Sequence, residues 1–595
     1  MRAALAVFSG AFLLFWLQPL IGRLLLPRYG GGSAVWAVTL VFFQTALLLG
    51  YAWAHLIVLR LSPRAGRLAH GVLALGALAA LPITAPAFTA SSPAAGLLLA
   101  LVVGVGLPAA VLATTAPLVQ AWVAQAGGSP WRLYAWSNAG SLLALVAYPF
   151  VLEPALGATR QATLWSIGFV VAVAALAAVG AQGWGGLHAA TREDPGPAPP
   201  RLDRLYWFGL TACSSALLVA TTDQLTEDLA ATPFLWILPL ALFLLSYIFA
   251  FGSPRWTRRA VWLPLFGAGL VAQWWALSSG FRASILVQIV AHAGTLFAAC
   301  MVLHGELVRA RPAPARLTGF YLTTALGGAV GGALVSLVAP AVLPIRVELP
   351  AALLLAGGLA LVGLRRSRAV DPLRGEPAWI WALPVGVLLG LGGLYAREFA
   401  HDHRDVMESL RSFYGVLRVR ELDADDPRGP ARRLLHGRIM HGMEFTDARR
   451  GKPNSYYGPR SGVGLLFALR HDEPPRRVAA LGLGVGTLSA FQRCGDRLDF
   501  FEIDPLVEVL ARRYFSYLDP GCTDVRVIIA DGRLGLAAAQ EPYAIILLDA
   551  FSGDAVPTHL LTREAIASAL DHLTGDGVIA VNVSNRHLDL RPVVR

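Results

Sequence analysis

Long apolar stretches alternate with short polar connections over the first two thirds of the chain. Each is long enough, or nearly so, to cross a hydrocarbon core of about 30 Å as a helix. The pattern predicts a polytopic α-helical membrane domain over residues 1–396, with blocks at 1–182 and 205–396 joined by a polar, proline-bearing connection. About thirteen segments are expected, near 3–26, 33–58, 70–88, 95–123, 134–157, 161–182, 205–222, 233–252, 260–279, 283–303, 318–344, 349–364 and 378–396.

After residue 396 the chain changes to the composition and periodicity of a soluble domain. Short alternating stretches up to Phe445 predict a small N-terminal β-hairpin unit, within a part that spans 397–475 together with a loop and a helix. Over 476–595, apolar strands alternate with helical stretches, which predicts an α/β Rossmann-like domain with a parallel sheet. The strands are expected near 477–483, 498–503, 525–529, 544–548 and 578–583. The chain stops soon after the fifth strand, where this fold normally continues, so either the sequence is a fragment or this version of the fold is trimmed.

Composition agrees with a membrane protein, since 55% of residues are hydrophobic and only 15% are charged. The net charge of +11 does not indicate a nucleic-acid partner, because the arginines gather in short connections between apolar segments. The four cysteines (Cys213, Cys300, Cys494 and Cys522) are far apart without a CxxC spacing. We therefore expect neither a disulfide framework nor a zinc site, and no metal.

Four short motifs in the last part of the chain carry the candidate chemistry: LGLGVGT at 481–487, FFEID at 500–504, ADG at 530–532 and LLDAFSGDAVP at 547–557. Glycines let a chain turn tightly beneath a ligand, and an acid at the end of the next strand can accept both ribose hydroxyls. Glu502 has that position, 20 residues after Gly482. Asp531 is placed to reach an adenine amino group, and Asp549 ends the fourth strand beside the same crevice. The ordered set predicts a site for a nucleoside or a nucleotide.

Two other classes of nucleotide-binding enzyme fit these motifs less well. A nicotinamide enzyme would have its third fingerprint glycine directly after Gly486, where Thr487 stands. A methyltransferase usually has an acid two residues before the first glycine, and that position is Ala480. Methyl transfer would yield S-adenosylhomocysteine.

The segment from about Ser412 onward resembles the spermidine synthase family of aminopropyltransferases, and the whole chain resembles the bacterial membrane-fused members of that family. The resemblance implies that the family's GGGDGG motif, which holds the nucleoside, corresponds to Gly482, Gly484 and Gly486. The EID glutamate that binds ribose then corresponds to Glu502, and the GDG aspartate that binds adenine to Asp531, followed by Gly532.

The resemblance also implies the catalytic residues. The aspartate that deprotonates the attacking amine corresponds to Asp549, with Ser552 downstream and with Asp554 available to hold a cationic amine. The gatekeeper tyrosine corresponds to Tyr456 or Tyr457. The glutamine near the sulfonium arm aligns loosely with His441.

From the same resemblance, the substrates are S-adenosylmethionine or its decarboxylated form and a polyamine, and 5'-methylthioadenosine is released. The partners implied are a small amine or sulfonium substrate and the lipid bilayer, without nucleic acid, and the family allows a homo-oligomer. In the reaction that the resemblance implies, the amine displaces the nucleoside thioether at the carbon next to the sulfonium. The enzyme aligns this nucleophile and removes its proton.

Two departures from the family pattern keep other functions open. Val485 replaces the acid inside GGGDGG, and the YHE-like gate ends at Gly458, so two acidic contacts for a polyamine or its donor are missing. Loss of negative charge favours a donor that keeps its own carboxylate, and a cyclase or lyase would release methylthioadenosine without an acceptor. The chain could also be a transporter whose soluble domain senses a nucleoside.

Sidedness gives two conflicting indications. Arginine-rich connections follow the even-numbered segments, so the positive-inside rule puts these connections in the cytoplasm of a cell with an inner membrane. With thirteen spans, the soluble part would then lie outside. An adenosyl sulfonium is made in the cytoplasm, however, so a cytoplasmic catalytic domain is expected, with one segment miscounted at 95–123 or 349–364.

Overall fold

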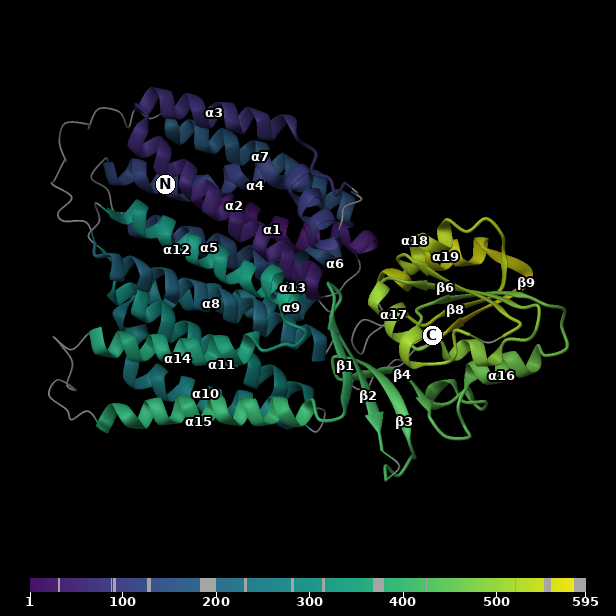
Figure 1. Cartoon of the computed structure of the whole chain (residues 1–595). Helices are drawn as coiled ribbons and strands as arrows, with labels where there is room; N and C mark the ends of the chain where they lie inside the picture. The colour runs from purple at the N-terminus through teal and green to yellow at the C-terminus, as the bar shows by residue number, and fades with distance from the viewer. Residues whose placement is uncertain are drawn as a thin grey trace.

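The computed structural model describes the whole chain apart from residues 30–32, 87, 89–91, 126–129, 182–198, 229–232, 280–282, 313–315, 367–378, 424, 520, 551–557 and 583–595. Figure 1 shows three parts in a row, with a helical bundle at one end, a small antiparallel sheet in the middle and an α/β unit at the other end.

The bundle contains ten described helices that are long and apolar enough to cross a membrane. Three further helices, α3, α5 and α15, pack with them, since α3 contacts α4 and α7, α5 contacts α1 and α9, and α15 contacts α10 and α14. The chain is therefore a multi-pass membrane protein. The helices are α1 (Arg2–Tyr29), α2 (Ser33–Arg60), α3 (Pro63–Ala79), α4 (Pro93–Gln125), α5 (Pro130–Ala147), α6 (Glu153–Ala155), α7 (Ala158–Gly180), α8 (Arg201–Asp228), α9 (Pro233–Gly252), α10 (Arg259–Ser279), α11 (Ile285–Arg309), α12 (Leu317–Ala333), α13 (Ala339–Val342), α14 (Glu348–Arg366) and α15 (Trp379–Asp402).

Small residues set the spacing of helices inside the bundle. A Cβ added at Gly331 of α12 would lie 2.0 Å from the backbone oxygen of Ala212 in α8, and one at Gly327 would lie 2.6 Å from the oxygen of Phe208. Lipid provides no hydrophobic force to press helices together, so their association depends on close van der Waals packing. Small residues such as glycine permit this close approach of the backbones. These glycines therefore have a packing role.

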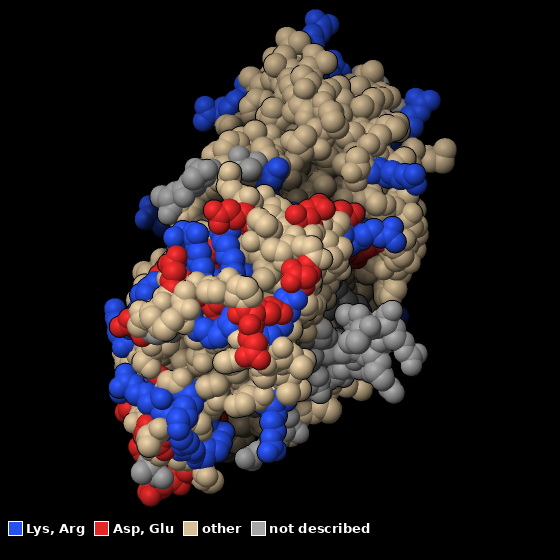
Figure 2. Space-filling model, turned by 90° about the vertical axis from the view of Figure 1, so that its right-hand side faces the viewer, with Lys and Arg blue, Asp and Glu red and all other residues tan. Residues whose placement is uncertain are grey.

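The outer surfaces of the parts differ in polarity. In Figure 2, seen from the soluble end, basic and acidic residues interleave over the soluble part, while the bundle behind it is mostly uncharged. Large apolar side chains such as Leu75, Val171, Leu383 and Leu389 are exposed on the helices. Exposed apolar belts of this kind fit contact with lipid.

The middle part is a four-stranded antiparallel sheet in the order β1-β2-β3-β4. The predicted hairpin unit is therefore present, with one more strand at its start. It is anchored on the bundle: Arg411 forms an ion pair of 2.5 Å with Glu348, and Phe413 packs against the bundle core. The strands are β1 (Val406–Arg411), β2 (Val416–Leu422), β3 (Ala431–His436) and β4 (Ile439–Phe445).

The α/β unit has a five-stranded parallel sheet in the order β7-β6-β5-β8-β9. Alternate residues of its strands join two separate cores: Val478 and Ala480 pack with α17, whereas Ala479 and Leu481 pack with α18 and α19. This period of two confirms the Rossmann-like class, with helices on both faces. The strands are β5 (Arg477–Leu481), β6 (Arg497–Glu502), β7 (Asp524–Ile529), β8 (Tyr543–Leu548) and β9 (Leu573–Val581), and the helices are α16 (Gly462–Leu469), α17 (Pro505–Tyr514), α18 (Gly532–Ala537) and α19 (Arg563–Asp571).

The segment after the glycine turn is a short 3-10 helix at Thr487–Phe491, and β6 begins only a few residues later. The expectation that the cysteines form no disulfide was wrong. Cys494 and Cys522 form a disulfide across 28 residues of sequence. The register explains this bond: β6 and β7 are neighbours with Arg497 opposite Asp524, so the residues just before both strands meet. Sequence spacing alone does not show such a meeting.

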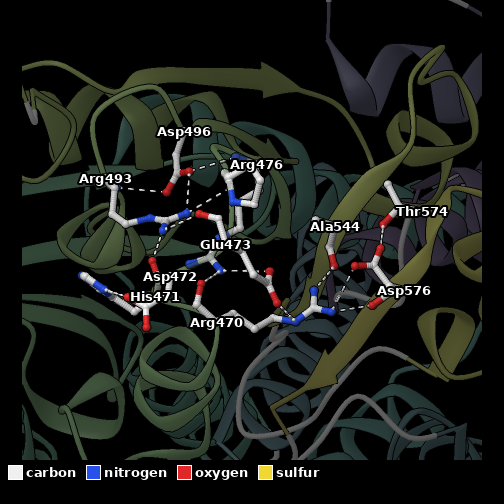
Figure 3. A network of polar contacts seen from close by, with 11 residues as sticks. Arg470, His471, Asp472, Glu473, Arg476, Arg493, Asp496, Ala544, Thr574 and Asp576 are labelled. Carbon is white, nitrogen blue, oxygen red and sulfur yellow. Dashed lines mark hydrogen bonds and ion pairs between the residues drawn. The ribbon is translucent and has the colours of Figure 1, made fainter.

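A polar network closes the edge of the sheet where β5 and β6 begin (Figure 3). Asp496 accepts the backbone N–H of Arg476 at 2.9 Å and that of Arg493 at 3.0 Å. Arg470 donates to the backbone oxygens of Ala544 at 3.4 Å and Asp576 at 2.5 Å, which joins α16 to β8 and β9. This edge is held together by charge-assisted hydrogen bonds, and the opposite edge remains open for a ligand.

Candidate active site

The described motif residues meet at the carboxyl edge of the parallel sheet. Gly482 follows β5, Glu502 ends β6, Asp531 follows β7 and Asp549 follows β8. A pocket at this edge is lined by all four, and its other wall includes Leu417 and residues of β3 and β4. Because strand order changes direction at β5, this is the position where open α/β sheets bind ligands.

Glycines form the floor of the pocket. Gly482 has φ +104°, and a Cβ there would lie 2.4 Å from the backbone oxygen of Asp549. Gly484 has φ +55°, and a Cβ there would lie 2.5 Å from the backbone oxygen of His441. Only glycine fits both places without strain. Gly486 also has positive φ but lies against Leu518, and it supports the turn without lining the pocket.

Glu502 is buried beside this floor, and its carboxylate is fixed by the backbone. Its Oε2 accepts the N–H of Leu483 and its Oε1 accepts the N–H of Asp504, both at 3.0 Å. Burial raises the pKa of Glu502 to about 7, although these backbone donors lower it. Each carboxylate oxygen keeps a second lone pair, so Glu502 can accept two hydroxyls of a ribose.

Asp531 also lines the pocket, next to Gly532. Its Oδ1 accepts the backbone N–H groups of Arg533 and Leu534, both at 3.1 Å, and so caps α18. Its Oδ2 lies 3.1 Å from Nε2 of His559, a buried residue that also lines the pocket. One lone pair on Oδ2 remains for an amino group. Sequence reasoning missed His559, since it belongs to no motif.

Asp549 has both carboxylate oxygens held by side chains. The hydroxyl of Tyr457 donates to Oδ2, and the side-chain amide of Asn582 donates to Oδ1 at 2.6 Å. Desolvation raises the pKa of Asp549 to about 6, while the two hydrogen bonds lower it. The pKa of Tyr457 is well above its usual range because of burial and the adjacent carboxylate. Asp549 is therefore mostly ionised at neutral pH and still able to take up a proton.

Of the two tyrosines in the gate motif, only Tyr457 contacts this carboxylate. The hydroxyl of Tyr456 donates instead to the backbone oxygen of His441 at 3.4 Å. Asn582 was missed by the sequence reasoning, although its position directly after β9 was a usable signal, since the carboxyl ends of parallel strands share one edge. Asp554 and Ser552 fall in residues 551–557, outside the described residues.

His441 lies in β4 and lines the pocket. Burial, with a smaller contribution from His436, lowers the pKa of His441 to about 3, so the ring is neutral at physiological pH. Its buried Nε2 has no hydrogen-bond partner among the described residues. A neutral imidazole can form a hydrogen bond with a polar ligand group, but it offers no positive charge.

Two aromatic residues outside the motifs complete the pocket. Tyr29 ends α1 of the membrane bundle, and Tyr414 lies between β1 and β2. The residues beside Tyr414 tie it to both sides: Phe413 packs in the bundle, and the hydroxyl of Ser412 donates to Asp504 at 2.6 Å. No sequence pattern connects Tyr29 with the distant motifs, because only folding brings α1 to the soluble part.

Arginine and lysine are absent from the described lining of the pocket. Arg438 of the small sheet lies outside the lining and donates to the backbone oxygen of Leu277 in α10. Val485 does not line the pocket either; it is fully buried, and a Cβ at Gly442 would lie 2.5 Å from its side chain. The described pocket therefore presents carboxylates without an arginine or lysine beside them.

The chain is similar in sequence to known aminopropyltransferases. No family model matches the chain. It is 38% identical over 205 residues to the polyamine aminopropyltransferase of Vibrio vulnificus (strain CMCP6), and 25% identical over 190 residues to a probable polyamine aminopropyl transferase of Bifidobacterium longum (strain NCC 2705). These matches span 33% and 31% of this chain, and 66% and 39% of the length of the two relatives.

A crystal structure of spermidine synthase in complex with the transition-state analogue AdoDATO is also similar, at 21% identity and a TM-score of 0.24. The alignment covers 30% of this chain and 57% of that one. The chain therefore joins a multi-pass helical membrane domain to an α/β domain that is similar in sequence to the polyamine aminopropyltransferases.

Proposed function

We propose that this protein is a membrane-bound aminopropyltransferase that moves the aminopropyl group of decarboxylated S-adenosylmethionine to a polyamine and releases 5'-methylthioadenosine. The observation that carries the proposal is Asp549, held by Tyr457 and Asn582 at the edge of a glycine-floored pocket. Similarity to the polyamine aminopropyltransferases supports the same reaction.

In this proposal each part of the pocket has one task. Glu502 binds the ribose hydroxyls, Asp531 binds the adenine amino group, and the glycines give the nucleoside room. Asp549 takes the proton from the incoming amine, whose nitrogen lone pair then forms the new bond to the methylene carbon. The carbon–sulfur bond breaks with its electron pair remaining on sulfur, which leaves a neutral thioether. Alignment of amine and carbon supplies most of the remaining acceleration.

The charge of the pocket favours the decarboxylated donor. Four carboxylates, those of Glu502, Asp504, Asp531 and Asp549, are among the described lining residues, without an arginine or lysine. A donor carboxylate would find no arginine or lysine to pair with there and would be repelled by the ionised carboxylates, whereas a sulfonium with a free ammonium group is attracted. The replacement of the family's acid by Val485 does not favour a donor with a carboxylate, because the side chain of Val485 is buried away from the pocket.

The second candidate is a cyclase or lyase that releases methylthioadenosine from S-adenosylmethionine without an acceptor. Gly458 favours it, because the acid that would follow the gate tyrosines is missing from the sequence. His441, neutral and with a free buried nitrogen, could orient a donor carboxylate by a hydrogen bond. Such a bond is weaker than the ion pair that a carboxylate usually receives.

Product chromatography separates these candidates. Detergent-purified protein is incubated with S-adenosylmethionine or its decarboxylated form, each with and without putrescine and spermidine. We expect methylthioadenosine and a longer polyamine only with the decarboxylated donor and an amine. Methylthioadenosine from S-adenosylmethionine without an amine would establish the second candidate. Tight nucleoside binding without any product would indicate a sensor domain.

The Asp549→Asn variant tests the assigned base within the same assay. Asparagine keeps the size and one acceptor oxygen but cannot take the proton, so turnover should fall by at least a hundredfold. Binding of methylthioadenosine should change little, because Asp549 contacts the amine side of the pocket. Unchanged turnover would remove Asp549 from its role.

The orientation of this domain in the membrane is a separate question. A cytoplasmic position would give the site direct access to an adenosyl sulfonium, and that access is the argument in its favour. The structure supplies arguments for the opposite side.

A further inference from the structure

The soluble part lies against one end of the helical bundle, here called the docking end (Figure 1). Arg411 is paired with Glu348 at the start of α14, and Arg438 donates to Leu277 in the last turns of α10. Tyr29, the last residue of α1, lines the pocket. The ends of α1 and α10 and the start of α14 thus mark the docking end. Their other ends mark the far end.

Arginines are divided unequally between the two ends. Helices that are joined by short connections run in alternating directions, so each connection belongs to one end (Figure 1). The described arginines near the far end are Arg2, Arg60, Arg64, Arg67, Arg201, Arg204, Arg255, Arg258, Arg259, Arg309, Arg311, Arg316, Arg365 and Arg366. Those near the docking end are Arg23, Arg28, Arg160, Arg346, Arg397 and Arg404.

This asymmetry orients the bundle. Short loops rich in arginine stay in the cytoplasm, because basic residues close to a span resist translocation. The far end is therefore the cytoplasmic end. The docking end, together with everything attached to it, then lies on the outer side.

The number of helices agrees with this orientation. If the segment at 95–123 or the one at 349–364 did not cross the membrane, the soluble part would lie on the cytoplasmic side. Both α4 and α14, however, are long and apolar enough to cross. The chain enters the bundle at the far end with α1 and leaves it at the docking end with α15, which continues into β1.

The disulfide between Cys494 and Cys522 is independent evidence. Both cysteines are exposed at the surface of the soluble part, whereas the free Cys213 and Cys300 are buried in the bundle. Exposed disulfides persist in oxidising compartments and are kept reduced in the cytoplasm. An exposed pair on this domain fits the outer side of the membrane.

We infer that the spermidine synthase-like domain faces the outer, oxidising side of the membrane, and that the arginine-rich far end faces the cytoplasm. The inference concerns orientation and does not depend on which reaction the pocket catalyses. Its consequence is that the pocket takes its substrates from the outer side or through the bundle.

Cysteine accessibility in the full-length protein tests this orientation. Asp472→Cys places a thiol at a fully exposed position of the soluble part, and Leu61→Cys places one between α2 and α3 at the far end. Sealed spheroplasts are treated with a membrane-impermeant maleimide, before or after permeabilisation with detergent. The native chain is the control, because its cysteines are paired or buried.

We expect the Asp472→Cys variant to be labelled in sealed spheroplasts and the Leu61→Cys variant only after permeabilisation. The native chain should stay unlabelled until a reductant opens the disulfide. The reverse labelling of the two variants would overturn the inference, and so would labelling of native Cys494 and Cys522 without a reductant. As a control for folding, the thermal unfolding temperature of each purified variant is compared with that of the native protein. Equal temperatures exclude misfolding as the cause of the labelling.

Discussion

The hydroxyl of Tyr457 should set the pH at which the catalytic base works. It donates to Oδ2 of Asp549. Desolvation raises the pKa of Asp549 and this hydrogen bond lowers it, and the net value is about 6. The Tyr457→Phe substitution removes the donor and keeps the ring. Without the donor, the ionised form of Asp549 is less stable, so its pKa rises further.

The size of the shift follows from the strength of the bond. A hydrogen bond to a charged group contributes about 1.5–3 kcal/mol, and one pKa unit corresponds to about 1.36 kcal/mol. The pKa of Asp549 should therefore rise by about 1–2 units, to about 7–8. With a pKa of about 7.5, the ionised fraction at pH 6.5 falls about eightfold, while at pH 9 it hardly changes.

The assay is kcat/KM for methylthioadenosine release between pH 5 and pH 9, because this parameter reports the free enzyme's essential base. In the native protein the rate should rise with pH through about 6, and in the Tyr457→Phe variant through about 7–8. Tyr456→Phe is the matched control: this neighbour donates to a backbone oxygen, so its removal should leave the profile in place.

An unmoved profile in the Tyr457→Phe variant would refute the reasoning, since the hydrogen bond would then not act on the base. A loss of rate that is equal at every pH would refute it in another way. It would assign Tyr457 to substrate positioning and leave the pKa of Asp549 to burial alone.

Three further predictions follow from the geometry. The pKa of Glu502 is about 7 and its ionised form accepts hydroxyls, so methylthioadenosine should bind more tightly as pH rises from 6 to 8, and calorimetry should show that Glu502→Gln removes this dependence. Tyr29→Ala should weaken the same binding about tenfold, for a loss of about 1–2 kcal/mol of apolar contact, while Tyr29→Phe should not. Arg411→Ala leaves Glu348 buried without its partner, which should cost about 3–5 kcal/mol of stability in thermal unfolding, and the double variant with Glu348→Ala should recover part of that loss.

The membrane bundle and the class of the soluble fold could be predicted from the sequence. Apolar segments long enough to cross lipid have few alternatives, because every backbone polar group must be paired within the segment. The strands of the parallel sheet were also recognisable, since each alternates with a helical stretch of suitable length. Only their ends shifted by a few residues, as at β5 and β9.

The motif residues could be named in advance for a related reason. Gly482, Glu502, Asp531 and Asp549 each follow or end a predicted strand, and all parallel strands present their carboxyl ends at one edge. Their partners were less visible. His559 lines the pocket from a segment that carries no motif, so only its contacts identify it. Asn582 belongs to no motif either, and only its place directly after β9 pointed to the edge where it contacts Asp549.

By itself the sequence determined the elements that depend on local pattern: spans from apolar length, strands from alternation, and motif residues from their place at strand ends. The tertiary structure alone decided which distant residues meet, namely Tyr29 with the soluble pocket, Tyr457 rather than Tyr456 with Asp549, and Cys494 with Cys522. Local patterns are set by neighbours along the chain, whereas these meetings depend on how strands register and how the two parts dock. A contact between residues far apart in sequence leaves no periodic trace in either segment.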